Sequence, residues 1–216
     1  MKILVTAATI FEIQPFLDHL ATHTYPDCQV TTLIGGIGMM HTAFQLGRQF
    51  ATSRPDIAIQ AGIAGCFDHS WEIGKVVIIE NEQLGDLGVE DDQAFKDLFD
   101  IQLWQPDQAP FNNRQLINSL DNLPFIPALP RVSGVTINTV SGSERTRNLL
   151  VAKYAPDVES MEGAAFHYAC LQEKIPFLQL RSISNYVEVR DKSKWNIPLA
   201  IRTLNETLIK YIEQWN

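Results

Sequence analysis

Short apolar runs rich in Val, Ile and Ala alternate along this chain with segments of helical periodicity. Runs typical of buried strands lie at residues 3–6, 30–34, 57–59, 76–79, 132–137 and 177–183, with a shorter one near 157–158. Segments typical of helices lie at residues 11–20, 39–51, 145–154, 162–173 and 198–215. Because parallel strands need a long crossover between them, usually a helix, this alternation predicts an α/β fold. We expect an α/β/α sandwich around a central mixed, mostly parallel sheet.

The stretch from residue 82 to residue 130 interrupts the alternation. It carries many Asp, Asn, Gln and Pro residues with scattered aromatics, and its periodicity is poor. We interpret it as a long excursion from the sheet and not as a separate domain. A chain of 216 residues fits one large domain with a substantial core, so we expect a single domain over residues 1–216.

Charge and cysteine content narrow the classes of partner and compartment. The formal net charge is −8 and the pI is about 5.1, which argues against nucleic acid or an anionic membrane as the main partner. The three cysteines form no Cys-x-x-Cys pair, and their odd number argues against a disulfide framework. No stretch approaches the roughly 20 apolar residues that span a membrane. We therefore expect a cytoplasmic protein.

Neither a metal nor a nucleotide cofactor is expected. The five histidines are spread along the chain, and none pairs with Cys or Glu at a metal-ligand spacing. The loop Gly35–Gly38 lacks the third glycine of the dinucleotide fingerprint, so an ordinary tight turn explains it.

Candidate functional residues follow the ends of the predicted strands. In open α/β sheets, ligands bind beyond the carboxyl ends of the strands, so we expect these residues to meet on one rim. The helix dipole alone can explain an acid in a first helical turn, such as Glu162. A guanidinium in an apolar strand, such as that of Arg181, needs a buried partner. The candidates are Glu12 after the first strand, Gly62–Gly65 after the third, Glu162 after residues 157–158, and Arg181, Ser184 and Asn185 at the last strand.

Three segments, in this order, resemble the nucleoside phosphorylase and nucleosidase superfamily. The opening strand with Glu12 resembles the nucleosidase start, residues 158–165 resemble the ribose-binding segment, and residues 181–185 resemble the base-binding segment. The continuation at residues 186–196 is similar to that of futalosine hydrolases. The resemblance covers nearly the whole chain and is weakest at residues 82–130. It implies a nucleoside phosphorylase-like fold and cleavage of the N-glycosidic bond of a purine nucleoside.

The resemblance also implies roles for individual residues in a reaction through a sugar with oxocarbenium character. Glu162 would accept hydrogen bonds from the ribose hydroxyls and stabilise the positive charge, while Met161 packs on the sugar. Glu12 would be the general base for the attacking water, and Arg181 would orient that water or Glu12. Further substrate contacts are expected from Ile63, Gly65, Val140, Ser184, Arg190 and Trp195.

Asn185 indicates which purine base the substrate carries. Adenine-specific nucleosidases of this superfamily usually have Asp at this position, and an amide cannot supply a catalytic proton. It can donate to N7 or O6 while its carbonyl accepts from a base N–H, which suits a 6-oxopurine such as the hypoxanthine of futalosine. The carboxyphenyl ketone of futalosine would need an apolar slot and a cation, which Trp195 with Arg190, Lys192 or Lys194 could supply.

Three alternatives stay open. A phosphate-dependent purine nucleoside phosphorylase would cleave the same bond, although Glu12 would repel phosphate and Ile63 replaces a hydroxyl residue that many relatives carry. A nucleosidase of the methylthioadenosine/S-adenosylhomocysteine type is disfavoured by Asn185. A non-catalytic nucleoside-binding protein could share the fold. The resemblance further implies water as co-substrate, a homo-oligomer (a dimer or higher), and a place in menaquinone biosynthesis.

Overall fold

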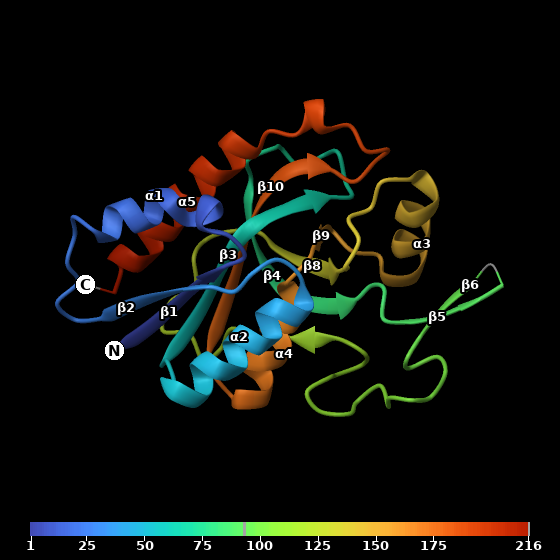
Figure 1. Cartoon of the computed structure of the whole chain (residues 1–216), viewed down its shortest axis with the longest axis horizontal. Coiled ribbons are helices and arrows are strands. Elements are labelled where there is room, and N and C mark those ends of the chain that lie inside the picture. The colour runs from blue at the N-terminus through green and yellow to red at the C-terminus, as the bar shows by residue number, and fades with distance from the viewer. Residues whose placement is uncertain (93, 216) are drawn as a thin grey trace.

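The computed structural model describes residues 1–92 and 94–215 (Figure 1). Its strands are β1 (Lys2–Ala7), β2 (Gln29–Ile34), β3 (Ile57–Cys66), β4 (Val76–Leu84), β5 (Gly88–Asp91), β6 (Ala94–Asp97), β7 (Leu116–Ile117), β8 (Arg131–Thr136), β9 (Val158–Ser160) and β10 (Phe177–Tyr186). Its helices are α1 (Ile10–Leu20), α2 (Met39–Thr52), α3 (Glu144–Tyr154), α4 (Gly163–Glu173) and α5 (Ile197–Glu213), with a 3₁₀ turn η1 (Lys192–Lys194). Each strand and helix predicted from the sequence is present.

The central sheet has eight strands in the order β10-β4-β8-β9-β3-β1-β2, with β7 paired to β4 and a further pairing between β10 and β3. The strands β2, β1, β3 and β10 run parallel to one another, and β4, β8 and β9 form a second parallel group. The two groups meet in antiparallel pairs, β4 with β10 and β9 with β3. This confirms the predicted mixed, mostly parallel sheet.

Two pairs of helices cover the two faces of the sheet. Along β1, Ile3 and Val5 point to the core shared with α1 and α5, whereas Leu4 points to the core shared with α2 and α4. This alternation follows from the two-residue period of a strand, and two buried faces require apolar residues at both sets of positions. Figure 1 shows β1 and β3 between the α1–α5 pair and the α2–α4 pair. The predicted α/β/α sandwich is therefore confirmed.

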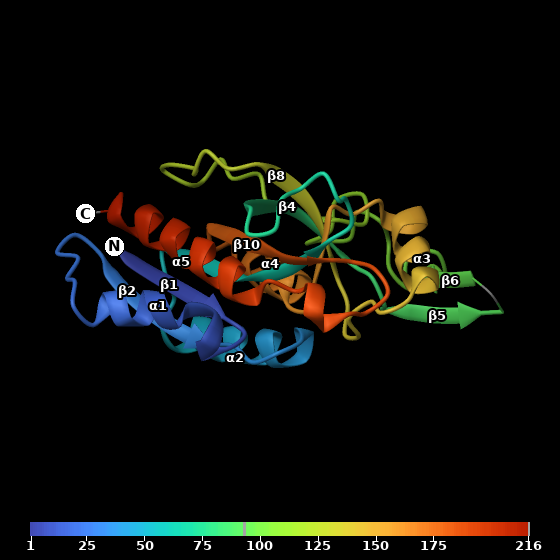
Figure 2. The ribbon, with the colours of Figure 1, turned by 90° about the horizontal axis from the view of Figure 1, so that it is seen from above.

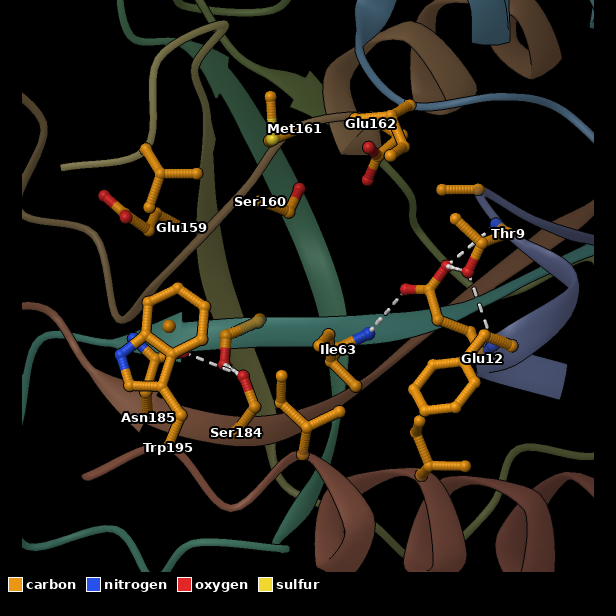
Figure 3. Close-up of a pocket in the computed structure, with 18 of the residues that line it drawn as sticks. Thr9, Glu12, Ile63, Glu159, Ser160, Met161, Glu162, Ser184, Asn185 and Trp195 are labelled. Atoms are coloured by element: carbon orange, nitrogen blue, oxygen red, sulfur yellow. Dashed lines mark hydrogen bonds between the residues drawn. The ribbon is translucent and has the colours of Figure 1, made fainter. Parts of the chain in front are cut away.

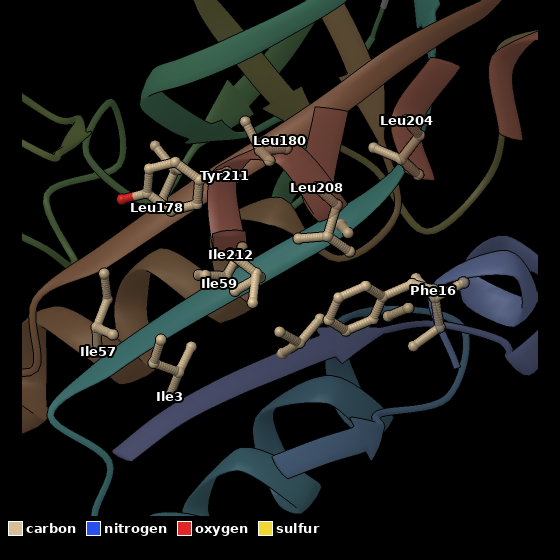
Figure 4. Close-up of a cluster of buried hydrophobic side chains, with 14 of the residues drawn as sticks. Ile3, Phe16, Ile57, Ile59, Leu178, Leu180, Leu204, Leu208, Tyr211 and Ile212 are labelled. Carbon is tan, nitrogen blue, oxygen red and sulfur yellow. The ribbon is translucent and has the colours of Figure 1, made fainter. Parts of the chain in front are cut away.

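The largest apolar core lies under α1 and α5. On α5, Leu204, Leu208 and Ile212 recur every four residues and pack against Ile59 of β3 and Phe16 of α1 (Figure 4). All five side chains are buried. Truncation of such a side chain to Ala typically costs about 2–5 kcal/mol of stability. This core fixes α1 against the sheet, and α1 begins at the candidate site.

The structure corrects two expectations about detail. The strand β3 continues through Gly62–Gly65 to Cys66, and β10 continues through Asn185 to Tyr186, so these candidates lie within strands and not after them. The excursion contains the β5–β6 hairpin and β7, and Figure 2 shows that hairpin projecting beside α3, away from both termini.

None of the helices in the described residues combines the length and apolar character that crossing a membrane requires.

Candidate active site

A cavity of about 330 Å³ lies where β1, β3, β9 and β10 end. The sequence predicted that all candidate residues would lie at the carboxyl ends of parallel strands. Instead, β9 runs antiparallel to β3, so residues 159–162 enter the site from the direction opposite to that of β3. Figure 3 shows Glu12 and Glu162 at one end of the cavity and Asn185 and Trp195 at the other. The lining residues are Ala8, Thr9, Phe11, Glu12, Ile37, Ile63, Ala64, Gly65, Ile137, Val140, Glu159, Ser160, Met161, Glu162, Ser184, Asn185, Trp195, Ile197 and Ile201.

Glu12 is held by the first turn of α1. The Thr9 N–H and hydroxyl donate to Glu12 Oε2 at 3.0 and 3.1 Å, and the Glu12 N–H donates back to Thr9 Oγ1, which forms a capping box. The backbone N–H of Ile63 donates to Oε1 at 3.3 Å. The helix kinks at Ile13, before Pro15, whose ring disfavours a continuous helix. This turn therefore positions Glu12 at the end of β3.

Burial raises the pKa of Glu12. Nearby Glu162 raises the pKa further, whereas Arg181 and the N–H groups of Ile63 and Thr9 oppose the rise. A carboxylate with a raised pKa is a stronger base than one in water, and general bases work best when their pKa lies near the operating pH. The geometry and the pKa both suit the predicted general base, a role that stays a prediction.

Glu162 stands immediately before α4 and faces the glycine loop 35–38. The backbone N–H of Gly38 donates to Glu162 Oε1 at 3.1 Å. Gly38 has φ +90°, a conformation that favours glycine, and it is the N-cap of α2. The glycine loop 35–38, which the sequence indicated to be an ordinary turn, therefore helps to hold the carboxylate of Glu162.

Arg181 lies behind the two carboxylates and not in the cavity wall. Its side chain is 2% exposed, and its guanidinium donates to Glu162 Oε2 at 3.4 Å, to the Ile63 carbonyl at 3.3 Å and to Gln60 Oε1 at 3.1 Å. A Cβ on Gly62 would overlap the guanidinium, which explains the glycine within the strand. Glu162 is thus the buried charged partner that we expected for Arg181. The role of Arg181 in orienting the water or Glu12 stays a prediction.

Another buried carboxylate, that of Glu82, anchors the start of α4. Glu82 of β4 accepts from Thr136 Oγ1 at 2.8 Å and from Gln179 Nε2 at 2.9 Å, and Thr136 Oγ1 accepts from the Ala164 N–H at 2.7 Å. Burial raises the pKa of Glu82 to about 7, and Glu162 adds to the rise. Gly163 permits this arrangement, because a Cβ there would overlap Glu82. Glu82 lies far from Glu162 in the sequence, and it is not among the candidates predicted from the sequence.

The Asn185 amide is oriented by its neighbours. The Ser184 hydroxyl donates to Asn185 Oδ1 at 2.8 Å, and Asn185 Nδ2 donates to the Tyr186 carbonyl at 3.1 Å. One N–H of the amide is left for a ligand in the cavity. Ser184 Oγ also contacts the Ala64 carbonyl at 3.2 Å, which ties β10 to β3 across the site.

Most other candidate residues share this cavity. Ile63, Gly65, Val140, Met161 and Trp195 line it, together with Ser184. Arg190 lies outside it, in a smaller neighbouring hollow that shares Asn185 and Trp195, with its guanidinium 5.8 Å from the centre of the Trp195 ring. Lys194 is paired with Glu188 at 2.7 Å.

Glu159 lines the cavity but is not among the candidates predicted from the sequence. It lies in the middle of β9, three residues before Glu162, and its side chain reaches the cavity. An acid inside a short buried strand was the signal that could have revealed it, since buried acids need partners.

Comparison with known proteins identifies the class. The family model of the phosphorylase superfamily matches residues 7–213, and the chain belongs to this superfamily. Within it, the futalosine hydrolase of Thermus thermophilus is 30% identical over 170 residues, which span 78% of this chain and 75% of the relative. The resemblance predicted from the sequence is confirmed.

Solved structures share the fold. The native structure of futalosine hydrolase from Helicobacter pylori strain 26695 superimposes with a TM-score of 0.80 at 17% identity, covering 99% of this chain and 98% of the other. The 5'-methylthioadenosine/S-adenosylhomocysteine nucleosidase from Helicobacter pylori with butyl-thio-DADMe-Immucillin-A gives a TM-score of 0.81 at 18% identity, with 99% and 98% coverage. The predicted nucleoside phosphorylase-like fold is confirmed.

Proposed function

We propose that this chain is an N-glycosyl hydrolase that cleaves futalosine with water and releases hypoxanthine. The observation that carries hydrolysis over phosphorolysis is the charge of the cavity wall. Glu12, Glu159 and Glu162 line it, and none of the described lining residues is Lys, Arg or His. A phosphate dianion beside these carboxylates would be repelled at close range. A neutral water meets no such penalty.

The sugar is expected at the end where Glu12 and Glu162 face each other. Water attacks C1′ while the bond from C1′ to N9 breaks and its electrons pass to the purine. Glu12 takes the proton of the water, and Glu162 accepts from the ribose hydroxyls and offsets the positive charge on the sugar. Arg181, tied to Glu162 at 3.4 Å, keeps that carboxylate in place.

The base is expected at the Asn185 end of the cavity. The free amide N–H of Asn185 donates to N7 or O6 of hypoxanthine, so it stabilises the leaving base as that base gains electrons. Because the amide holds no transferable proton, the released base takes its proton from solvent. The ionised aromatic acid of futalosine would then lie beyond Trp195, where Arg190 supplies a cation.

We further propose that the chain works as a homo-oligomer and as one domain over residues 1–216. A row of exposed apolar side chains on α1, α2 and the loop before α2 supports a self-association surface beside the cavity. These side chains are Ile10, Phe11, Ile37, Met40 and Phe44, of which Phe11 and Ile37 also line the cavity. We also propose that it is a cytoplasmic enzyme of menaquinone biosynthesis, as the resemblance to futalosine hydrolases implies.

Substrate comparison tests the proposal. Purified protein is incubated with futalosine, inosine, adenosine and methylthioadenosine, and kcat/KM for base release is measured for each. We expect the highest value for futalosine. A higher value for methylthioadenosine would support the nucleosidase alternative and refute the proposed substrate.

A further inference from the structure

An asparagine lies on the buried face of α5, next to apolar residues of the largest core. Asn205 is 1% exposed and follows Leu204, whose side chain packs in that core. Asn is seldom buried, and the polar groups of a buried amide need hydrogen-bond partners. Two partners of the Asn205 amide lie on α1, which runs beside α5 in Figure 1 and Figure 2. The side chain therefore connects the two helices.

The Asn205 amide is inserted where the helix α1 is irregular. In a regular α-helix the N–H of Phe16 would donate to the carbonyl of Glu12, four residues earlier. Here the Phe16 N–H donates to Asn205 Oδ1 at 3.0 Å, and the Glu12 carbonyl accepts from Asn205 Nδ2 at 2.9 Å. Ile13, between them, has φ −121° and ψ 15°, which is not helical. One amide group thus bridges the break in α1 directly at Glu12.

The orientation of this amide is fixed by a third hydrogen bond. Asn205 Nδ2 also donates to the Ile201 carbonyl at 2.7 Å, one turn earlier in α5. Because carbonyl groups face Nδ2 and an N–H group faces Oδ1, only one of the two amide orientations makes all of these hydrogen bonds. Ile201 lines the cavity, so the connection runs from the cavity wall through Asn205 to the main chain of Glu12.

Glu12 is thereby held at both ends. Its carboxylate accepts from Thr9 and Ile63 (Figure 3), and its main-chain carbonyl accepts from Asn205. A displacement of the main chain would carry the carboxylate with it. Misplacement by about 1 Å can cost an enzyme on the order of a hundredfold in rate. The hydrogen bond at the carbonyl of Glu12 therefore matters for the position of the carboxylate.

We propose that Asn205 is a positioning residue for Glu12. It holds α1 in its kinked form, which places the Glu12 carboxylate at the end of β3, where the attacking water is expected. This inference rests on the proposed function, because it needs Glu12 to be the general base. Without the amide, the N–H of Phe16 and the carbonyl of Glu12 would lose their partner or would bond to each other in a regular turn. Closure of a regular turn would move Glu12 relative to Ile63.

The competing explanation is that Asn205 only stabilises the packing of α1 against α5. In that case its replacement would lower the melting temperature, and any loss of activity would be the same whether or not residue 12 carries a carboxylate. A positioning role predicts instead that the loss of activity depends on the carboxylate of Glu12.

A double-mutant cycle separates the two explanations. We would measure kcat and KM for futalosine in wild type, Asn205→Leu, Glu12→Gln and the double variant, well below the melting temperature of each. Asn205→Leu should lower kcat by about tenfold to a hundredfold, with KM changed by less than about threefold. In the Glu12→Gln background it should lower kcat by less than about threefold, because the group that Asn205 positions is already gone. An equal fold loss in both backgrounds would overturn the inference.

Asn205→Ser is the second variant, because its small side chain fits the site without a steric conflict. Its hydroxyl can still bond to the Ile201 carbonyl within the helix, but it is too short to bridge Phe16 and Glu12. We expect the same dependence on the Glu12 carboxylate as for Asn205→Leu. Wild-type kcat in a folded Asn205→Ser protein would overturn the inference.

The matched control is Tyr211→Phe on the same helix. It removes a hydroxyl that donates to the Phe125 carbonyl at 3.1 Å, from a residue that is also 1% exposed. Its kcat should equal that of wild type even if its melting temperature falls. A loss of kcat comparable to that of Asn205→Leu would count against positioning and overturn the inference.

Substrate choice keeps this inference apart from the proposed function. If the wild type cleaves inosine, adenosine or methylthioadenosine but not futalosine, the proposed substrate fails, and the same cycle with the cleaved nucleoside decides the role of Asn205. If Glu12→Gln retains the kcat of wild type, the general base and the inference both fail. Cleavage of none of the four nucleosides would refute the proposed function and the inference together.

Discussion

Replacing Glu82 by Gln should change how stability depends on pH. Glu82 is 1% exposed, and its oxygens accept from Thr136 and Gln179. A protonated Glu82 can also form a hydrogen-bond chain with Gln179 and His167. Gln179 Oε1 and His167 Nε2 are buried without partners among the described residues, and the two side chains adjoin. If the Gln179 amide turns over, its N–H can donate to His167 while its oxygen accepts the Glu82 proton.

The magnitude follows from the pKa of Glu82. Burial raises that pKa from 4.5 to about 7 in the folded protein. At about 1.4 kcal/mol per pKa unit, the shift corresponds to roughly 3 kcal/mol. Because the folded state binds the proton more tightly, this stabilisation is complete below the unfolded pKa of 4.5 and is lost as pH rises through about 7. Glu82→Gln, a neutral isostere, removes the dependence.

Urea unfolding of both proteins between about pH 5 and pH 8 measures the effect. The free energy of unfolding of Glu82→Gln, relative to wild type, should increase by up to roughly 3 kcal/mol across that range. The matched control is Glu80→Gln in the same strand, where the carboxylate is partly in solvent and paired with Arg131. A difference between Glu82→Gln and wild type that stays constant with pH would refute the reasoning.

Two further predictions concern catalysis. Glu12→Gln should lower kcat by about 10²–10⁴-fold with an unchanged circular dichroism spectrum. In the wild type, kcat/KM should fall as pH drops through the raised pKa of Glu12, because a protonated acid cannot take the proton of water. If kcat/KM does not change with pH in the wild type or in Glu12→Gln, this residue is not the general base. Asn185→Asp should narrow the preference for futalosine over its 6-amino counterpart. When protonated, the introduced carboxyl group can donate its single O–H to N7 of adenine. An unchanged ratio of kcat/KM values would contradict this.

The strand and helix order could be predicted because apolar periodicity is a local property of the sequence. The strand ends could not, since β3 continues through Gly62 only because the missing Cβ there leaves room for the Arg181 guanidinium of β10. Apolar runs alone would have ended both strands earlier.

The candidate site was predicted in part for a similar reason. Glu12 and Glu162 stand in segments with a recognisable pattern, whereas the partners of Glu162 come from distant positions, Gly38 and Arg181. Glu159 carries only a general local signal, an acid inside a short buried strand, because its place in the cavity wall depends on the pairing of β9 with β3. Contacts that form only on folding decide these features.

We expect water, and not phosphate, to attack the sugar of futalosine. The most direct measurement is mass spectrometry of both products after incubation in oxygen-18 water, with and without inorganic phosphate. We expect free hypoxanthine, one oxygen-18 atom on the sugar product, and the same rate in both mixtures. A sugar product that carries a 1-phosphate, or a rate that rises with phosphate concentration, would contradict it.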